Sequence, residues 1–152
     1  MERNKAATMF NNIAHEYDFL NGLLSMRIDR IWRRRLRKML DTSDAVYILD
    51  VATGTGDLAI ECAKSRKTRI ITGVDISEKM LEKGREKIAK KHLSDRIDLR
   101  YGESENLNFE SDTFDATVVG FGVRNFENPE KGLKEIHRVT KPSGKVFILD
   151  FS

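Results

Sequence analysis

Hydrophobic and polar residues follow one another along this chain in blocks whose lengths indicate strands and helices in alternation. Short apolar runs typical of buried strands begin at Val46 and then cover Arg69–Asp75, Ile97–Tyr101, Phe114–Val119 and Lys145–Asp150. Apolar residues at helical spacing predict helices that begin near Leu58 and that cover Ser77–Lys91 and Pro129–Val139. Strands that alternate with helices form a parallel sheet with helices on both faces, so the pattern predicts an α/β, doubly wound, Rossmann-like fold.

The segment from about Ala6 to Leu40 precedes the first strand and predicts two helices, separated at Asn21-Gly22. Two apolar stripes at helical spacing support this, formed by Met9, Phe10, Ile13, Tyr17 and Leu20, and by Ile28, Ile31, Trp32, Leu36, Met39 and Leu40. We interpret both stripes as surfaces that face the core or cover a pocket.

The composition is that of a globular protein with one real core, because 39% of the 152 residues are hydrophobic and 34% are charged. We expect one domain over residues 1–152, with a helical cap at 1–41 and an α/β core at 46–152. No apolar run approaches the ~20 residues of a membrane span, and the polar start is not a secretory signal, so we expect a cytoplasmic protein. Cys62, the only cysteine, excludes an intramolecular disulfide, and the three histidines lack metal-ligand spacing, so no metal site is predicted.

The net charge of +3 belongs to the N-terminal segment. Residues 1–41 hold nine Lys or Arg and five Asp or Glu, which is +4, and the remainder is −1. The run Arg33–Lys38 is most simply a solvated helix face, and contact with anionic lipid headgroups is the alternative. Nucleic acid is disfavoured because no aromatic stacking pattern accompanies the arginines.

A glycine turn follows the first strand and opens the next helix. Gly54 and Gly56 let the backbone bend tightly and approach a ligand without a Cβ in the way. The helix that follows presents free N–H groups beside the turn. This stretch therefore predicts a ligand site, although a purely structural turn in which Asp57 favours the helix start is the alternative.

Acidic residues at the strand ends decide which ligand the turn suits. Asp50 and Asp57 would place two carboxylates beside a pyrophosphate, which disfavours a nicotinamide dinucleotide. S-adenosylmethionine carries a sulfonium cation and an amino group and has no phosphate. Asp75, nineteen residues after Gly56, ends the second strand and can accept hydrogen bonds from both ribose hydroxyls.

Two further loops lie at the carboxyl ends of predicted strands. The loop Gly102-Glu103-Ser104 can recognise an adenine amino group through its carboxylate and a ring nitrogen through a backbone N–H, or it is merely solvent-exposed. The loop Gly120–Asn125 combines two glycines with Arg124 and Asn125, which folding alone hardly explains, although an arginine paired with a surface acid is the simpler alternative.

With these motifs in view, the chain resembles the ubiquinone/menaquinone biosynthesis C-methyltransferases from about Phe10 to Ser152. The segments that carry the resemblance are Phe10–Ala14, Tyr17–Ser25 with Trp32, Leu49–Asp57, Gly73–Leu81, Phe121–Asn125 and Arg138–Pro142. The glycine turn alone indicates a class I methyltransferase, and the Tyr17–Ser25 and Phe121–Asn125 segments narrow the family.

The resemblance implies methyl transfer from S-adenosylmethionine to a ring carbon of a prenylated quinol, with demethylmenaquinol as the first candidate and the ubiquinone-pathway equivalent as another. It implies strand order 3-2-1-4-5 and a catalytic set of Arg124, Asn125 and Tyr17. The residues expected to bind the cofactor, from the turn and from the resemblance together, are Asp50, Gly54, Thr55, Gly56, Asp75, Ile76, Glu103, Ser104 and Gly120.

This sequence departs from the family pattern in places. Asp29 stands for a usual histidine, Glu103 for an Asp or Asn, Ser143 for a glycine and Asp150 for a glutamate. The family also continues for about another third, with a helix and two strands, so the last strand is expected at a sheet edge. Self-association through that edge is our hypothesis. A methyltransferase for another small or lipid-like acceptor, or a cofactor-binding module without turnover, are the alternative functions.

Overall fold

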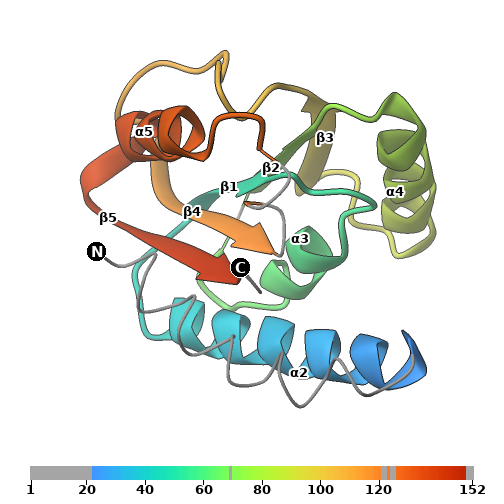
Figure 1. The fold of residues 1–152 in the computed structure, drawn as a ribbon. Coiled ribbons are helices and arrows are strands. Elements are labelled where there is room, and N and C mark those ends of the chain that lie inside the picture. Colours follow the sequence, from blue (N-terminus) through green and yellow to red (C-terminus); the bar gives the residue numbers. More distant parts are fainter. Residues whose placement is uncertain (1–21, 69, 121–122, 124–125, 150–152) are drawn as a thin grey trace.

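The computed structural model describes residues 22–68, 70–120, 123 and 126–149, with side chains described from Asp29 onward (Figure 1). The helices are α2 (Gly22–Asp41), α3 (Asp57–Cys62), α4 (Glu78–Lys90) and α5 (Pro129–Val139). The strands are β1 (Tyr47–Val51), β2 (Ile70–Asp75), β3 (Ile97–Tyr101), β4 (Phe114–Gly120) and β5 (Thr140–Leu149). The predicted alternation of strands and helices after the N-terminal segment is confirmed.

The five strands form one sheet in the order β3-β2-β1-β4-β5, and every neighbouring pair is parallel. The predicted doubly wound fold and its strand order are therefore confirmed. The chain builds outward from β1 through β2 to β3, and then crosses back to place β4 on the other side of β1. This reversal places the topological switch point of the sheet at the carboxyl ends of β1 and β4, where ligands bind in folds of this kind.

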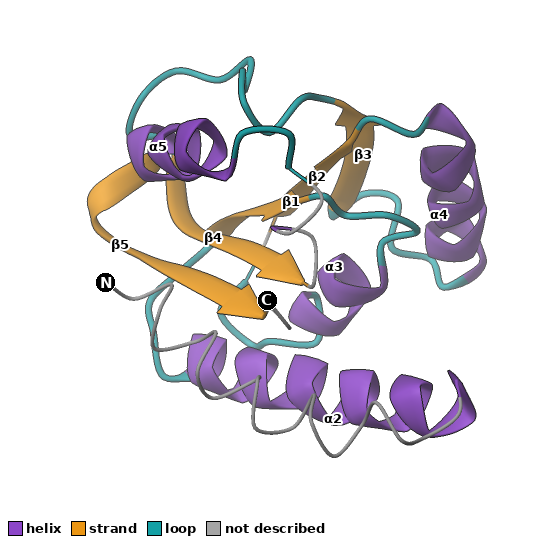
Figure 2. Cartoon of the chain, viewed as in Figure 1, coloured by secondary structure: helices purple, strands orange, loops and turns teal. Residues whose placement is uncertain are grey.

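Helices cover the two faces of the sheet separately, with α2 and α3 on one side and α5 on the other (Figure 2). Because side chains alternate along a strand, Ile48 of β1 joins the core with Leu36 and Leu58, while Leu49 joins the core with Ile136. Asp50 lies two residues after Ile48, so it points to the face that α3 covers.

The last strand begins earlier than predicted, because β5 starts at Thr140, five residues before the predicted start at Lys145. Thr140 pairs with Phe114 and Lys145 with Ala116, so β5 advances by five residues while β4 advances by two. The buried side chain of Thr140 fixes this early start of β5. The Thr140 hydroxyl donates to the carbonyl of Ile136 at 2.6 Å and lies 2.7 Å from the hydroxyl of Thr117.

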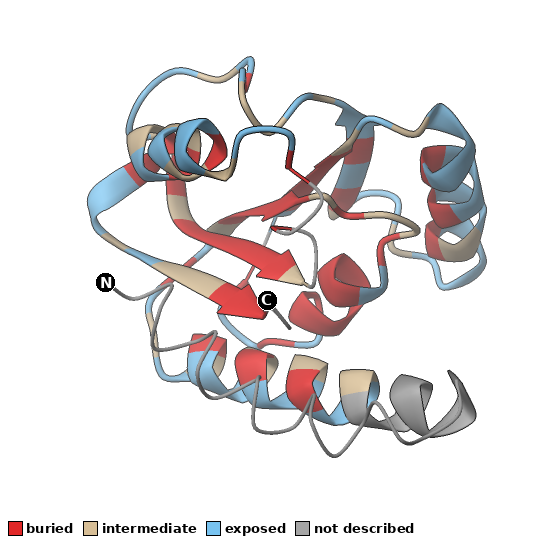
Figure 3. Ribbon diagram, viewed as in Figure 1, coloured by how far each residue is buried: buried red, intermediate tan, exposed pale blue. Residues whose placement is uncertain are grey.

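Helix α2 buries a narrower stripe than the sequence suggested (Figure 3). Trp32, Leu36 and Leu40 are buried at a spacing of four residues, whereas Ile31 and Met39 are about half exposed, at 53% and 52%. The core-facing interpretation was wrong for these two side chains, because residues 31 and 39 lie about 100° around the helix from 32 and 40. The first predicted helix and the side chain of Ile28 lie outside the described residues.

The basic run on α2 divides into two groups. Arg34, Arg35 and Lys38 are exposed, as the solvated interpretation predicts, and the guanidinium of Arg35 lies 4.7 Å from the ring centroid of Trp32. Within the described part of the chain, no helix has the length and apolar character needed to cross a membrane.

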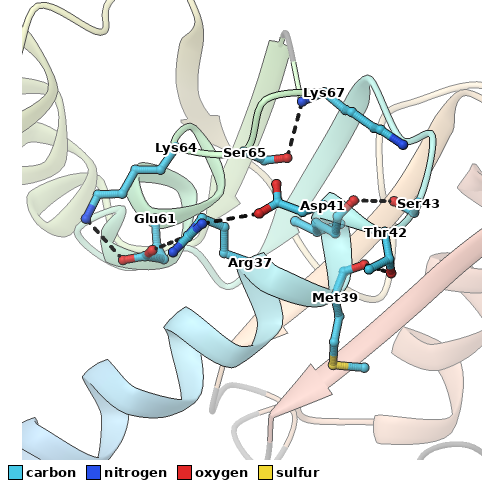
Figure 4. Close-up of polar contacts among 10 residues, drawn as sticks. Arg37, Met39, Asp41, Thr42, Ser43, Glu61, Lys64, Ser65 and Lys67 are labelled. Carbon is cyan, nitrogen blue, oxygen red and sulfur yellow. Dashed lines mark hydrogen bonds and ion pairs between the residues drawn. The ribbon is translucent and has the colours of Figure 1, made fainter.

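Arg37, in the middle of that run, instead joins α2 to α3 (Figure 4). Its Nε donates to Oε2 of Glu61 at 2.8 Å, and its Nη1 donates to Asp41 at 3.2 Å. Glu61 is only 7% exposed, and Lys64 donates to its other oxygen at 3.2 Å. The solvated interpretation was wrong for Arg37, because this side chain balances a buried carboxylate on the helix that begins at the glycine turn.

Candidate functional site

Every second residue of the loop between β1 and α3 has a left-handed backbone. The φ angles are 58° at Ala52, 58° at Gly54 and 82° at Gly56. Glycine adopts this conformation freely, whereas at Ala52 it costs about 1–2 kcal/mol. Gly56 donates to the carbonyl of Thr53 at 2.9 Å, and its own carbonyl accepts from Ile60 as α3 begins. The predicted strand, glycine turn and helix are confirmed.

Asp75 ties this loop to the end of β2. One carboxylate oxygen accepts from the Gly54 N–H at 2.8 Å and the other from the Ser77 N–H at 2.9 Å. The loop is held to β2 a second time, where Thr53 N–H donates to the carbonyl of Val74 at 2.9 Å. No lysine or arginine in the described part of the chain pairs with Asp75. This half-buried carboxylate is therefore fixed in place and retains lone pairs for a ligand.

Asp50 lies beneath the loop and is 1% exposed. Its Oδ2 accepts from the Thr53 hydroxyl at 2.7 Å, while its Oδ1 has no hydrogen-bond partner among the described residues. Burial is the main cause that raises the pKa of Asp50 from 3.8 to about 7, and the nearby charges of Asp75 and Asp57 add to it. The Thr53 hydroxyl and the backbone N–H of Ala59 in α3 oppose this rise in the pKa. A buried carboxyl with an open oxygen suits a cation or a hydroxyl donor.

Asp57 differs from the other two acids because it has a cationic partner. Lys87 of α4 donates to its Oδ1 and, at 3.0 Å, to the hydroxyl of Thr55. The sequence argument against a pyrophosphate assumed that Asp50 and Asp57 both present unbalanced negative charge at the turn. The structure changes that argument, since Lys87 balances Asp57 and a pKa of about 7 leaves Asp50 only partly ionised at neutral pH, so Asp75 contributes most of the unpaired charge at the turn.

The other predicted cofactor residues lie along the same carboxyl edge of the sheet. Ile76 follows Asp75 and is 68% exposed, and the N–H of Gly102 donates to the Asp75 carbonyl at 3.1 Å. Glu103 is exposed and accepts from the hydroxyl of Tyr101 at 3.1 Å. Ser104 donates to Glu105 at 2.9 Å. The loop after β3 therefore adjoins β2, with its side chains bonded to their sequence neighbours.

Gly120 ends β4 and packs on α3, since a Cβ there would lie 3.0 Å from Cδ2 of Leu58. The predicted catalytic residues Tyr17, Arg124 and Asn125 lie outside the described residues.

Sequence reasoning missed two side chains at this edge. Lys87 contacts the glycine turn from α4, and the only signal was its place beside the apolar Ile88. Glu105 accepts from the N–H of Asn128 at 3.3 Å, which links the loop after β3 to the start of α5.

The chain is similar to known proteins along its whole length. A profile of the ubiE/COQ5 methyltransferase family matches residues 1–152. The chain is 45% identical over 149 residues to a ubiquinone/menaquinone biosynthesis C-methyltransferase UbiE of Geotalea daltonii, covering 97% of this chain and 63% of that protein. It is 45% identical over 144 residues to a demethylmenaquinone methyltransferase of Bacteroides fragilis, covering 95% of this chain and 59% of that one.

Among solved structures, the chain resembles a putative S-adenosyl-L-methionine-dependent methyltransferase from Methanococcus maripaludis, with a TM-score of 0.71 and 26% identity, over 81% of this chain and 60% of that one. The chain thus spans about three fifths of the length of these curated relatives. The match of the family profile to every residue, together with the sheet order and the glycine turn, shows that this chain belongs to the ubiE/COQ5 methyltransferase family.

Proposed function

We propose that this chain binds S-adenosylmethionine and takes part in the transfer of the methyl group from this cofactor to a ring carbon of a prenylated quinol. Demethylmenaquinol is the first candidate for the quinol. One observation carries the proposal. Asp75, at the end of β2, is fixed by the Gly54 and Ser77 amides and lies beside the glycine turn without a cationic partner in the described chain. The names of the relatives, which are quinone-pathway methyltransferases, supply the acceptor class.

The residues present fit this cofactor. Asp75 can accept from ribose hydroxyls, and the unpartnered Oδ1 of Asp50 offers a buried acceptor on the α3 side. The turn would line the cofactor site with the backbone of Gly54 and Gly56 and with the hydroxyl of Thr55. Ile76, with Glu103, Ser104 and Gly120 further along the edge, would border the adenosine. The bound cofactor supplies an electrophilic methyl group on a cationic sulfur.

The chemistry would need a nucleophilic ring carbon, which appears when a quinol hydroxyl loses its proton. Arg124 stays protonated at neutral pH, so we assign it to stabilising phenolate charge or orienting the water that takes the proton. Asn125 would orient the quinol oxygen, and Tyr17 would cover the substrate. Alignment of the two reactants, with no covalent intermediate on the protein, is the expected source of rate.

Calorimetric titration with S-adenosylmethionine tests the cofactor assignment. We expect saturable binding to the parent chain that NAD does not displace, and a loss of about 100-fold in affinity on Asp75→Ala, because a ligand and the Gly54 and Ser77 amides all lose a charged acceptor. Asp98→Ala is the matched control, since this acid of β3 is exposed and pairs with Arg100. Circular dichroism checks folding. Binding of NAD in preference to S-adenosylmethionine would contradict the proposal.

Labelled methyl transfer to demethylmenaquinol and to a panel of other small aromatic and lipid-like acceptors then separates the proposed acceptor from its alternatives. Transfer to another acceptor alone would overturn the quinol assignment while leaving the cofactor site intact. Cofactor binding without transfer to any acceptor would identify a binding module.

We also propose that α2 contacts anionic lipid at the membrane surface. Its exposed cations Arg34, Arg35 and Lys38 accompany the half-exposed Ile31 and Met39, a combination suited to an interfacial helix. We expect co-sedimentation with phosphatidylglycerol vesicles that weakens in high salt and on Arg34→Glu. Equal binding to phosphatidylcholine vesicles would argue against an electrostatic contact.

Self-association is the second proposed contact. Among the described strands β5 pairs only with β4, and we propose that a second copy pairs with its other edge. Light scattering that stays monomeric at high concentration would refute this contact.

A further inference from the structure

One face of α4 packs closely against the glycine turn. A Cβ at Gly84 would lie 2.9 Å from the carbonyl oxygen of Thr55 and 3.0 Å from its carbonyl carbon, distances that backbone atoms do not tolerate. One turn further on, a Cβ at Gly56 would lie 3.6 Å from Cδ1 of Ile88. Positions 84, 87 and 88 share one side of a helix, so Lys87 is directed at the same loop.

The ammonium group of Lys87 bridges two side chains of that loop. It donates to the Thr55 hydroxyl at 3.0 Å and to Oδ1 of Asp57. These contacts join residues 32 and 30 positions apart in the sequence, so they connect α4 to the turn and to the first residue of α3. The Lys87 side chain is 36% exposed and that of Asp57 is 55% exposed.

An isolated ion pair with this exposure would contribute little, about 0–1 kcal/mol to stability. Lys87 differs from such a pair because its donors hold two members of one short loop whose backbone already touches α4 at Gly84. The Lys87 ammonium group therefore orients the Thr55 hydroxyl and balances the charge of Asp57. Its contribution to the stability of the whole chain is smaller.

We propose that Lys87 is a positioning residue of the cofactor loop, holding Thr55 and Asp57 in the arrangement that binds the adenosyl cofactor. The inference rests on the proposed function and extends it to a residue of α4 that lies behind the loop. It assigns Lys87 no contact with substrate and no part in proton transfer. Removal of the ammonium group would free the Thr55 hydroxyl and leave Asp57 without its cation.

Affinity for two ligands that differ in charge separates positioning from a direct charge effect. S-adenosylmethionine carries the sulfonium cation and S-adenosylhomocysteine lacks it. We expect Lys87→Met to weaken both by about tenfold, because a misplaced loop serves neither ligand, and Lys87→Arg to recover most of the loss. Lys83→Met is the matched control, since Lys83 is an exposed lysine of the same helix. The thermal midpoint of Lys87→Met should remain within a few degrees of the parent's.

Removal of a nearby cation would by itself favour binding of S-adenosylmethionine over S-adenosylhomocysteine, whose sulfur is neutral. Tighter binding of S-adenosylmethionine alone in Lys87→Met would therefore overturn the positioning role in favour of a charge effect. Unchanged affinity for both ligands in that variant would also overturn it. Failure of the parent chain to bind S-adenosylmethionine would instead remove the proposed function, and this inference with it.

A mutant cycle identifies the partners through which Lys87 acts. Asp57→Ala and Thr55→Val each remove one acceptor of the bridge. If Lys87 works through the loop, adding Lys87→Met to the pair Thr55→Val and Asp57→Ala should produce little further loss. A full additional tenfold loss in the triple variant would show that Lys87 acts elsewhere and would overturn the assignment. The cycle uses ligands that need no turnover, so it is independent of the acceptor.

Discussion

Replacing Asp50 with asparagine is expected to abolish a fall of about 4 kcal/mol in the free energy of unfolding that the parent chain undergoes between about pH 4 and pH 7. In the unfolded chain this carboxyl releases its proton near its ordinary pKa of 3.8, whereas burial in the folded chain raises that pKa to about 7. Between these values the folded state holds a proton that the unfolded state has lost. Raising the pH through this range therefore favours unfolding, and the effect is constant above it.

Chemical denaturation at a series of pH values from 4 to 8 measures this decline. Asparagine keeps an oxygen that can accept from Thr53, and it does not ionise. The difference between variant and parent isolates Asp50 from groups that change stability in the opposite direction. One such group is Asp115, where the hydrogen bonds from Lys141, Tyr47 and Val46 outweigh the effect of burial and lower the pKa.

Asp98→Asn serves as the matched control, because this acid is exposed on β3. It should retain the full decline of the parent. A decline that persists unchanged in Asp50→Asn would show that the carboxyl of Asp50 ionises normally in the folded chain.

Replacing Arg37 with methionine is expected to lower the free energy of unfolding by about 3 kcal/mol, because the variant leaves the carboxylate of Glu61 buried without its principal partner. Lys64 remains bonded to Glu61, yet its side chain is 60% exposed and it compensates little (Figure 4). Methionine keeps most of the apolar stem of the arginine side chain. Urea denaturation at pH 7 measures the loss.

Two further variants test the reason for this effect. Glu61→Gln should cost less than Arg37→Met, since Arg37 still pairs with Asp41 and no buried charge is left alone. Arg34→Met, on the exposed face of the same helix, should stay within about 0.5 kcal/mol of the parent. If Arg37→Met and Arg34→Met lowered the free energy of unfolding equally, the ion pair of Arg37 with Glu61 would not stabilise the contact between α2 and α3.

Local chemistry in the sequence determined the elements and their order. Helix α5 begins at Pro129, as predicted, because the side chain of Asn128 caps it by accepting from the N–H of Lys131 at 3.1 Å. The glycine turn is equally local, since Gly54 and Gly56 need only their own left-handed backbone. Alternating strands and helices leave few topologies open, so the parallel sheet followed from the same pattern.

Only the tertiary structure decided which charges at the site are balanced. Arg37 meets Glu61 across 24 residues, and Lys87 meets Asp57 across 30, and no periodicity in the sequence marks either partner. Burial of Asp50, and with it a pKa of about 7, depends on α3 folding back over β1. Sequence pattern reports local conformation and the apolar side of an element, whereas charge balance depends on which distant side chains the packed helices bring together.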